Sequence, residues 1–323
     1  MATASPEKST SAVAVFRHRA YLHYWIMRQL VSSSRQMAAV AIGWQVFELA
    51  RETRSVKEAA LLLGFVGLVQ FLPVFFLSLI GGQLADRADR KMILVVVNLT
   101  RLAASVALAA TPFMSTASAL WTIFAMAALL GVTNAFSPAA SNALYPNLVP
   151  RTELRQAIAV NSIGYQVSAI AGPAVGGFLY VFGPFTVYTT CAVMSALACL
   201  AIGTAKTPKQ QKLVGAHGLG LVIEGLKFIR SNTLLLGAIS PDLVVVLFAG
   251  ATALLPVFAK EILGVGAEGL GVLRAAPAMG AAAVAIWLAA NPLSHKNGAW
   301  MLWSIAVYGA ATLVFGLSSL FWL

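Results

Sequence analysis

Charged residues are scarce in this chain, and acidic ones most of all. Only 10% of the 323 residues are Asp, Glu, Lys or Arg, with 11 acidic residues against 22 basic ones. The chain is instead 59% hydrophobic, with a mean hydropathy of +0.82, which excludes an ordinary soluble domain. Its apolar residues come in runs of about 20, the length that crosses a bilayer as a helix, and they do not alternate with polar residues as barrel strands do. The sequence therefore predicts an all-α membrane protein.

The sequence also lacks the side-chain patterns of an enzyme or a metalloprotein. Cys191 and Cys199 fall in one apolar run, so they predict neither a disulfide framework nor a Cys/His metal site. No nucleophile is accompanied by a base, and no glycine-rich loop with a Lys-Ser or Lys-Thr pair is present to hold a nucleotide. We therefore expect no enzymatic activity, no cofactor, no metal and no direct coupling to ATP.

The apolar runs predict nine complete membrane-spanning helices and a division into two bundles. We expect a cytoplasmic tail at residues 1–20, an N-terminal six-helix bundle at 21–205, a cytoplasmic linker at 206–232 and an incomplete C-terminal bundle at 233–323. In the linker, the apolar spacing of Leu219–Arg230 predicts an interfacial helix. The chain ends just inside an expected tenth helix, so we expect it to be a fragment of a longer protein. The nine spans are Tyr21–Leu49, Ala59–Ile80, Met92–Thr111, Ala119–Ala139, Ala157–Phe182, Phe185–Ala205, Leu234–Phe258, Gly269–Ala289 and Ala299–Leu317.

The basic residues are distributed unevenly along the chain. With the N-terminus placed in the cytoplasm, 14 Lys and Arg fall in cytoplasmic segments, four in outer loops and four within the spans, which accounts for all 22. Positive charge accumulates on the cytoplasmic side of membrane proteins. The uneven distribution of the basic residues therefore sets the orientation, and the net charge of +11 does not indicate nucleic-acid binding.

The most informative stretch joins the second and third predicted helices. Gly82–Lys91 reads Gly-Gln-Leu-Ala-Asp-Arg-Ala-Asp-Arg-Lys, and half of its residues are charged. Because two helices joined by so short a link form a hairpin, the link must emerge into water. Gly82 would let two helices approach closely, and Asp86 could accept a hydrogen bond from Arg90 or face a helix N-terminus. The basic side chains would hold the loop at the cytoplasmic face; they are Arg87, Arg90 and Lys91.

This spacing resembles the signature loop between helices 2 and 3 of the major facilitator superfamily of secondary transporters, except that Asp89 stands where the general pattern has a second glycine. The stretches Gln36–Val46, Leu63–Gly67 and Phe71–Pro73 resemble the branch of that superfamily that includes the enterobactin exporter and drug-efflux-like members. The resemblance implies twelve helices in two bundles related by a pseudo-twofold axis. It also implies that the loop acts as a conformational latch. The alternative interpretation is a basic cytoplasmic loop of any membrane protein.

The fifth predicted helix carries a second pattern, in which Gly164 and Ser168 precede the sequence Gly-Pro-Ala-Val-Gly-Gly at 172–177. This spacing resembles the motif of antiporters within the superfamily, with Ser168 in place of one glycine. Glycine at every fourth position gives a helix a smooth face that a second helix can approach closely. Generic packing of small residues is the alternative interpretation. The residues of the motif are Gly164, Gly172, Pro173, Gly176 and Gly177.

Charged side chains inside the predicted spans are the candidates for substrate or proton contact, because a charge in a bilayer normally faces a cavity or a partner. Arg28 and Arg35 lie on one face of the first helix, although Arg28 could instead snorkel to the inner interface. Asp242 lies at a depth that matches Arg28, and we expect it to relay protons opposite that arginine. Its alternative role is local, because the Ser-Pro-Asp sequence at 240–242 is also typical of a helix start. Two further candidates are Arg101, which could belong to the loop lattice, and Arg274, which enters from the outer side.

Taken with the resemblance, these features predict a secondary active exporter of an amphipathic small molecule, siderophore-like or drug-like, that works by proton antiport and alternating access. The scarcity of charges within the spans disfavours a sugar or polyanion pathway built on charge clusters. Expected partners are the substrate, protons and the lipid bilayer, in a monomer, with neither nucleic acid nor nucleotide. The expected location is a bacterial inner membrane with the N-terminus in the cytoplasm. Two alternatives stay open: a lipid flippase, and a non-transporting receptor or scaffold on the same fold.

Overall fold

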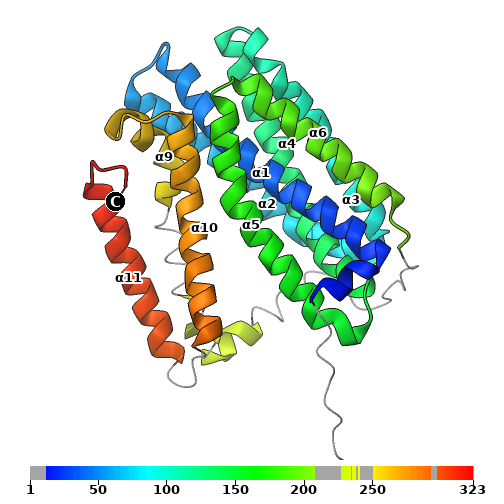
Figure 1. The fold of residues 1–323 in the computed structure, drawn as a ribbon. Helices are drawn as coiled ribbons and strands as arrows, with labels where there is room; N and C mark the ends of the chain where they lie inside the picture. The colour runs from blue at the N-terminus through cyan, green and yellow to red at the C-terminus, as the bar shows by residue number, and fades with distance from the viewer. Residues whose placement is uncertain are drawn as a thin grey trace, which may run out of the picture.

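The structure is a computed structural model that describes residues 12–207, 227–233, 235–237, 239–240, 250–291 and 297–322. Within these ranges the chain is helical and has no strand, as the sequence predicts. Figure 1 shows α1–α6 as one group of long helices, with α10 lying along α5. The elements of this first group are η1 Ala12–Arg17, α1 Arg19–Arg51, α2 Val56–Arg87, α3 Arg90–Ala109, η2 Thr111–Phe113, α4 Thr116–Leu144, η3 Tyr145–Asn147, η4 Arg151–Glu153, α5 Leu154–Tyr180 and α6 Pro184–Thr204.

The second group of elements follows the linker and is less regular. The helix predicted over 234–258 lies partly outside the described residues, and its described end is broken into short 3₁₀, α and π segments instead of one regular helix. Of the predicted interfacial helix, only residues 227–230 are described, and these are helical. The elements are η5 Gly250–Leu254, α9 Leu255–Val257, the π-helix η6 Phe258–Ile262, α10 Ala267–Ala290 and α11 Asn297–Leu317.

Eight of the nine predicted spans correspond to long helices in the described part of the chain, namely α1–α6, α10 and α11. By length and composition, six of these helices qualify as membrane spans: α2, α3, α4, α6, α10 and α11. The other two, α1 and α5, are long enough, but no stretch of either is apolar enough to qualify by composition. Residues 318–322 form no helix, so the start of a tenth helix is not seen among the described residues.

Local sequence explains where several helices begin. Ser55 caps α2, its hydroxyl accepting from the Glu58 backbone N–H while the Glu58 carboxylate accepts from the Ser55 backbone, which forms a complete capping box. Asp89 caps α3 and Ser115 caps α4, each with a side-chain oxygen that accepts a hydrogen bond from one backbone N–H of the first turn. The turn between α5 and α6 contains Gly183 at φ 97°, a left-handed conformation that favours glycine, directly before the proline that opens α6.

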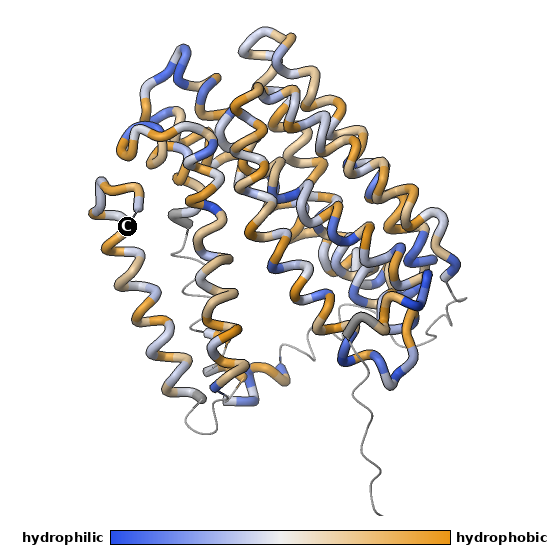
Figure 2. Tube along the Cα trace, viewed as in Figure 1, coloured by the Kyte–Doolittle hydropathy of each residue, from blue (hydrophilic) through white to orange (hydrophobic). Residues whose placement is uncertain are grey.

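Helix α1 lies in the interior of the bundle, and α5 packs between α1 and α10. Helix α1 packs against α2, α5 and α6, and α5 packs against both α1 and α10. By contrast, α2, α10 and α11 expose much of their apolar surface, as expected for helices that face lipid. Figure 2 shows hydrophobic residues along the lengths of the helices and hydrophilic residues gathered near helix ends.

Candidate functional site: a basic cavity and the contacts between the two groups of helices

A series of three adjoining cavities lies between α1, α3, α4 and α5, with Gln70 of α2 in the wall of the smallest one. Two of them have volumes of about 290 Å³ and 310 Å³ and share Arg28 and Tyr165 in their walls. The third, of about 50 Å³, adjoins the first through Arg35 and Arg101. We call the three together the basic cavity, because none of the described residues that line it is acidic. The structure thus brings three of the predicted candidate residues, Arg28, Arg35 and Arg101, to one site.

Arg28 lines the basic cavity and is held there by hydrogen bonds. Its Nη1 donates to the hydroxyl of Tyr24 at 3.0 Å and to that of Ser141 at 3.1 Å. Ser141 comes from α4, near the end of that helix. These contacts hold Arg28 in the wall of the basic cavity, near the end of α4.

Arg101 reaches the same cavity from α3, whereas the sequence suggested that it could belong to the loop between α2 and α3. Its Nη2 donates to Asn134 Oδ1 of α4 at 2.7 Å, and its side chain is buried. It therefore does not belong to the charge lattice of the loop between α2 and α3. Its guanidinium lies close enough to that of Arg35 for the two positive charges to repel each other.

Several polar groups around the basic cavity have no hydrogen-bond partner. Arg101 Nε, Ser32 Oγ and both amide atoms of Asn161 are buried and unpartnered. Arg35 is exposed to the cavity, and among the described residues no hydrogen bond or ion pair reaches its side chain. Buried polar groups are normally satisfied, so these atoms have hydrogen-bonding capacity left for a bound molecule.

Two candidates from the sequence do not join this site. Arg274 lies on α10, where its Nη2 approaches Gly43 of α1, and it lines a separate cavity of about 270 Å³ between α1, α5, η5 and α10. Asp242 lies outside the described residues, so its pairing with Arg28 stays a prediction.

The link between α2 and α3 differs from the loop that the sequence predicts. Helix α2 continues through Gly82 and Asp86 to Arg87, so only Ala88 and Asp89 separate the two helices. A Cβ at Gly82 would meet nothing within 4 Å, whereas one at Gly81 would lie 2.6 Å from the Ala135 carbonyl oxygen of α4. The close approach predicted for Gly82 therefore belongs to Gly81, because the rotation of α2 turns that residue toward α4.

The basic residues of this link bind the ends of three helices. Arg90 donates from Nε to the Ala85 carbonyl at 3.0 Å and from Nη1 to the Ala143 carbonyl of α4 at 2.8 Å. Lys91 Nζ donates to the Ala205 carbonyl after α6 at 2.7 Å. Cations at these positions satisfy carbonyls at helix C-termini, where negative partial charge gathers. Asp86 is half-buried. The bond predicted from Arg90 to the Asp86 carboxylate is replaced by bonds from Arg90 to backbone carbonyls.

The glycine motif of α5 lies against two different helices. A Cβ at Gly172 would lie 2.6 Å from Gln36 Cβ, and one at Gly176 would lie 2.8 Å from Met37 Cα, both on α1. On the other side, Gly177 Cα is close to Gly271 of α10, and a Cβ at Gly271 would lie 2.6 Å from the Pro173 carbonyl oxygen. The motif thus allows α5 to touch α1 and α10 at backbone distance.

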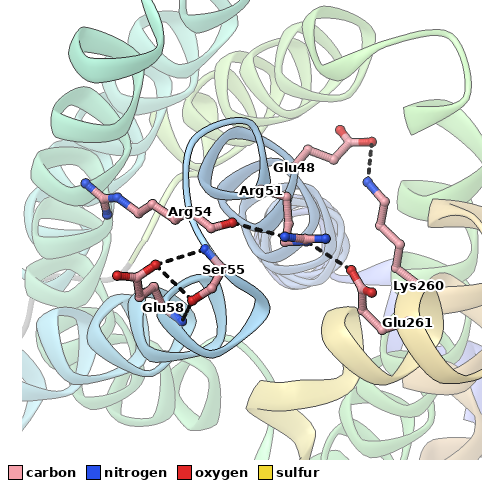
Figure 3. A network of polar contacts seen from close by, with 7 residues as sticks. All are labelled: Glu48, Arg51, Arg54, Ser55, Glu58, Lys260 and Glu261. Atoms are coloured by element: carbon pink, nitrogen blue, oxygen red, sulfur yellow. Dashed lines mark hydrogen bonds and ion pairs between the residues drawn. The ribbon is translucent and has the colours of Figure 1, made fainter.

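Ion pairs that no sequence motif indicates join the end of α1 to η6. Arg51 Nε lies 3.1 Å from Glu261 Oε1, and Lys260 Nζ lies 3.9 Å from Glu48 Oε1. Figure 3 shows both pairs bridging from α1 to the π-helical turn. We call these four residues the ion-pair gate. Tyr180 of α5 also donates to Glu48, at 2.9 Å. Opposite charges at the ends of neighbouring spans were the available signal, but sequence does not reveal which ends meet.

The chain is similar to known transport proteins along most of its length. A family model described as transmembrane secretion effector matches residues 10–323. Macrolide efflux protein A of Streptococcus pyogenes is 26% identical over 191 residues, which cover 58% of this chain and 46% of that protein. Enterobactin exporter EntS of Escherichia coli is 25% identical over 309 residues, which cover 93% of this chain and 70% of that protein.

Two more comparisons extend this similarity. The uncharacterized MFS-type transporter YfiS of Bacillus subtilis is 30% identical over 178 residues, which cover 51% of this chain and 40% of that protein. The chain thus spans about half or less of the length of YfiS and of macrolide efflux protein A. Among solved structures, a D-xylose-proton symporter superposes with a TM-score of 0.58 over 81% of this chain and 65% of that chain, at 14% identity. That likeness shows the fold.

Proposed function

This chain belongs to the transmembrane secretion effector family of the major facilitator superfamily, and we propose that the protein exports an amphipathic small molecule by proton antiport and alternating access. It is a multi-pass membrane protein of the transporter type. We place it in a bacterial inner membrane as a monomer, with its N-terminus and the link between α2 and α3 in the cytoplasm. The names of the macrolide and enterobactin exporters support efflux as the direction of transport.

The observation that carries this proposal is the difference between the two ends of the helices. At the end where α1 stops, the ion-pair gate joins α1 to η6, and the glycines of α5 and α10 hold those two helices at backbone distance. The basic cavity extends toward the opposite end, where α4 stops at Leu144 and α5 begins at Leu154. Alternating access requires such a site, closed at one end and approached from the other. The arrangement supports a conformation that faces the cytoplasm.

The link between α2 and α3 fits the role of a conformational latch in this proposal. Arg90 and Lys91 hold the ends of α2, α4 and α6 together through three backbone carbonyls. As a latch, these contacts would hold one conformer and release in the other when the bundle rocks. We propose Asp242 as the proton carrier, because an acid within a span is costly unless it functions there.

The test is an efflux assay with the full-length gene in a bacterial host that lacks its own exporters. We expect the gene to raise resistance to, or secretion of, at least one amphipathic compound in a sensitivity and metabolite-export screen. Inverted membrane vesicles should then show proton movement that depends on that compound.

Compound-dependent proton movement separates an exporter from a receptor or scaffold on the same fold. Displacement of the compound by a phospholipid would instead favour a flippase. A gene that changes neither resistance, secretion nor proton movement would contradict the proposal.

A further inference from the structure

The basic cavity holds positive charge that no described residue neutralises. Arg35 has no hydrogen-bond or ion-pair partner among the described residues, and it lies close enough to Arg101 for their charges to repel. Arg101 is 6% exposed and keeps an unpartnered Nε. An unpaired charge inside a membrane protein is energetically unfavourable. A negative group between the two arginines would remove both the repulsion and the unmet hydrogen bonds.

The rest of the cavity is suited to an apolar molecule with few polar groups. Volumes of about 290 Å³ and 310 Å³ lie at the lower end of the range of roughly 300–1,000 Å³ typical of small-molecule sites. Met27, Val31 and Ile158 give the walls apolar surface, and Tyr165 contributes an aromatic ring to both of these cavities. Asn161 adds an amide whose donor and acceptor are both free.

We propose that the basic cavity binds an amphipathic organic anion, with its acidic group between Arg35 and Arg101 and its apolar body along Tyr165. Guanidinium groups match the planar, paired oxygens of carboxylates and also bind sulfonates and phosphates. The sequence scatters these arginines over two distant spans, whereas the fold places them on one cavity. The inference rests on the proposed function for its physiological meaning, since the anion would be the exported substrate, but binding itself needs no transport.

The experiment measures binding by isothermal titration calorimetry to the full-length protein in nanodiscs of zwitterionic phosphatidylcholine, without any gradient. The probes are 2-naphthoate and its uncharged analogue 2-naphthalenemethanol, which share the apolar body and differ in the acidic group. We expect naphthoate to bind at least roughly tenfold more tightly than the alcohol, because a hydrogen bond to a charged group is worth more than a neutral one.

The variants locate the anion within the cavity. Arg35→Gln should weaken naphthoate binding by roughly tenfold or more and leave the alcohol unchanged. Arg35→Lys should keep part of the affinity, because it keeps the charge. Arg155→Gln is the matched control: it removes the same charge from an exposed position near the start of α5 that lines none of the three cavities. Since no hydrogen bond or ion pair of Arg35 with another described residue would be lost, its variants should unfold at the wild-type temperature or above.

Equal binding of naphthoate and the alcohol, or unchanged naphthoate binding in Arg35→Gln, would overturn the proposal. A repeat in discs that contain phosphatidylglycerol distinguishes two sources of the anion. Competition by that lipid would identify a lipid headgroup as an occupant, and undiminished binding would identify a soluble anion. Binding of naphthoate without any efflux would refute the exporter but not the anion site. Efflux that is unchanged in Arg35→Gln would refute the anion site but not the exporter.

Discussion

Reversing one charge of the ion-pair gate should open the end of the molecule that the gate closes. The four gate side chains are between 32% and 41% exposed, so solvent weakens both pairs. A pair at this exposure contributes about 0.2–1 kcal/mol. The two pairs together thus favour the closed end by about 1 kcal/mol. That free energy corresponds to a roughly fivefold change in the ratio of closed to open conformers.

Arg51→Glu places two acidic side chains where Arg51 and Glu261 now lie 3.1 Å apart, so repulsion replaces attraction. The ratio of closed to open conformers should fall roughly fivefold or more. Glu261→Lys added to Arg51→Glu restores opposite charges and should restore the ratio. Lys57→Glu is the matched control. Lys57 is exposed at the start of α2, at the same end of the molecule as the gate, and it belongs to neither ion pair.

The ratio can be measured with spin labels on exposed residues at either side of the gate, at Thr53 and Ile262. Electron–electron double resonance in nanodiscs would report a second, longer distance in Arg51→Glu that is absent from the double variant and from the control. If Arg51→Glu keeps the wild-type distance distribution, or if the double variant fails to recover it, the four residues do not act as a gate.

Three further outcomes are expected. Gly81→Ala should destabilise the fold by about 1–3 kcal/mol, because its methyl group would overlap the α4 backbone. The methyl group of Gly82→Ala meets no neighbouring atom, so this variant should stabilise the fold by up to about 1 kcal/mol. Equal unfolding temperatures of the two variants would contradict this prediction. Asp86→Asn in the full-length protein should lower turnover more than substrate affinity, and a pure loss of affinity would count against the latch. A cysteine at Thr53 should react only with reagents added from outside the cell, and labelling solely from the cytoplasm would reverse the topology.

The apolar runs of the sequence predict the helices well because a membrane span needs a fixed length of apolar chain. Boundaries are less accurate where charged residues continue a helix. Ile80 was the predicted end of the second span, yet α2 runs to Arg87, since charge at a helix end in water does not break the helix. The broken segment at 250–262 was also missed, because its composition is as apolar as that of a regular helix.

The candidate site could be predicted only in part. Arg28 and Arg35 share a face of one helix, which spacing alone establishes. That Arg101 joins them depends on how α3 packs beside α4 and α1, and no local pattern encodes this packing. The choice between Gly81 and Gly82 depends in the same way on the rotation of α2 about its axis. Some hydrogen-bond partners, such as the Ala143 carbonyl that accepts from Arg90, are backbone atoms, which every residue type provides.

The polarity of α1 has a consequence for how the newly made chain enters the membrane. An arginine at the centre of a helix opposes insertion through the translocon by about 2.5–3.5 kcal/mol, and α1 carries Arg28 and Arg35. The groups that satisfy Arg28 include Ser141, which is synthesised more than 100 residues later. Helix α1 should therefore wait beside the translocon until α4 has emerged, and a nascent chain stalled before Ser141 should integrate its first helix less completely than one stalled after α5.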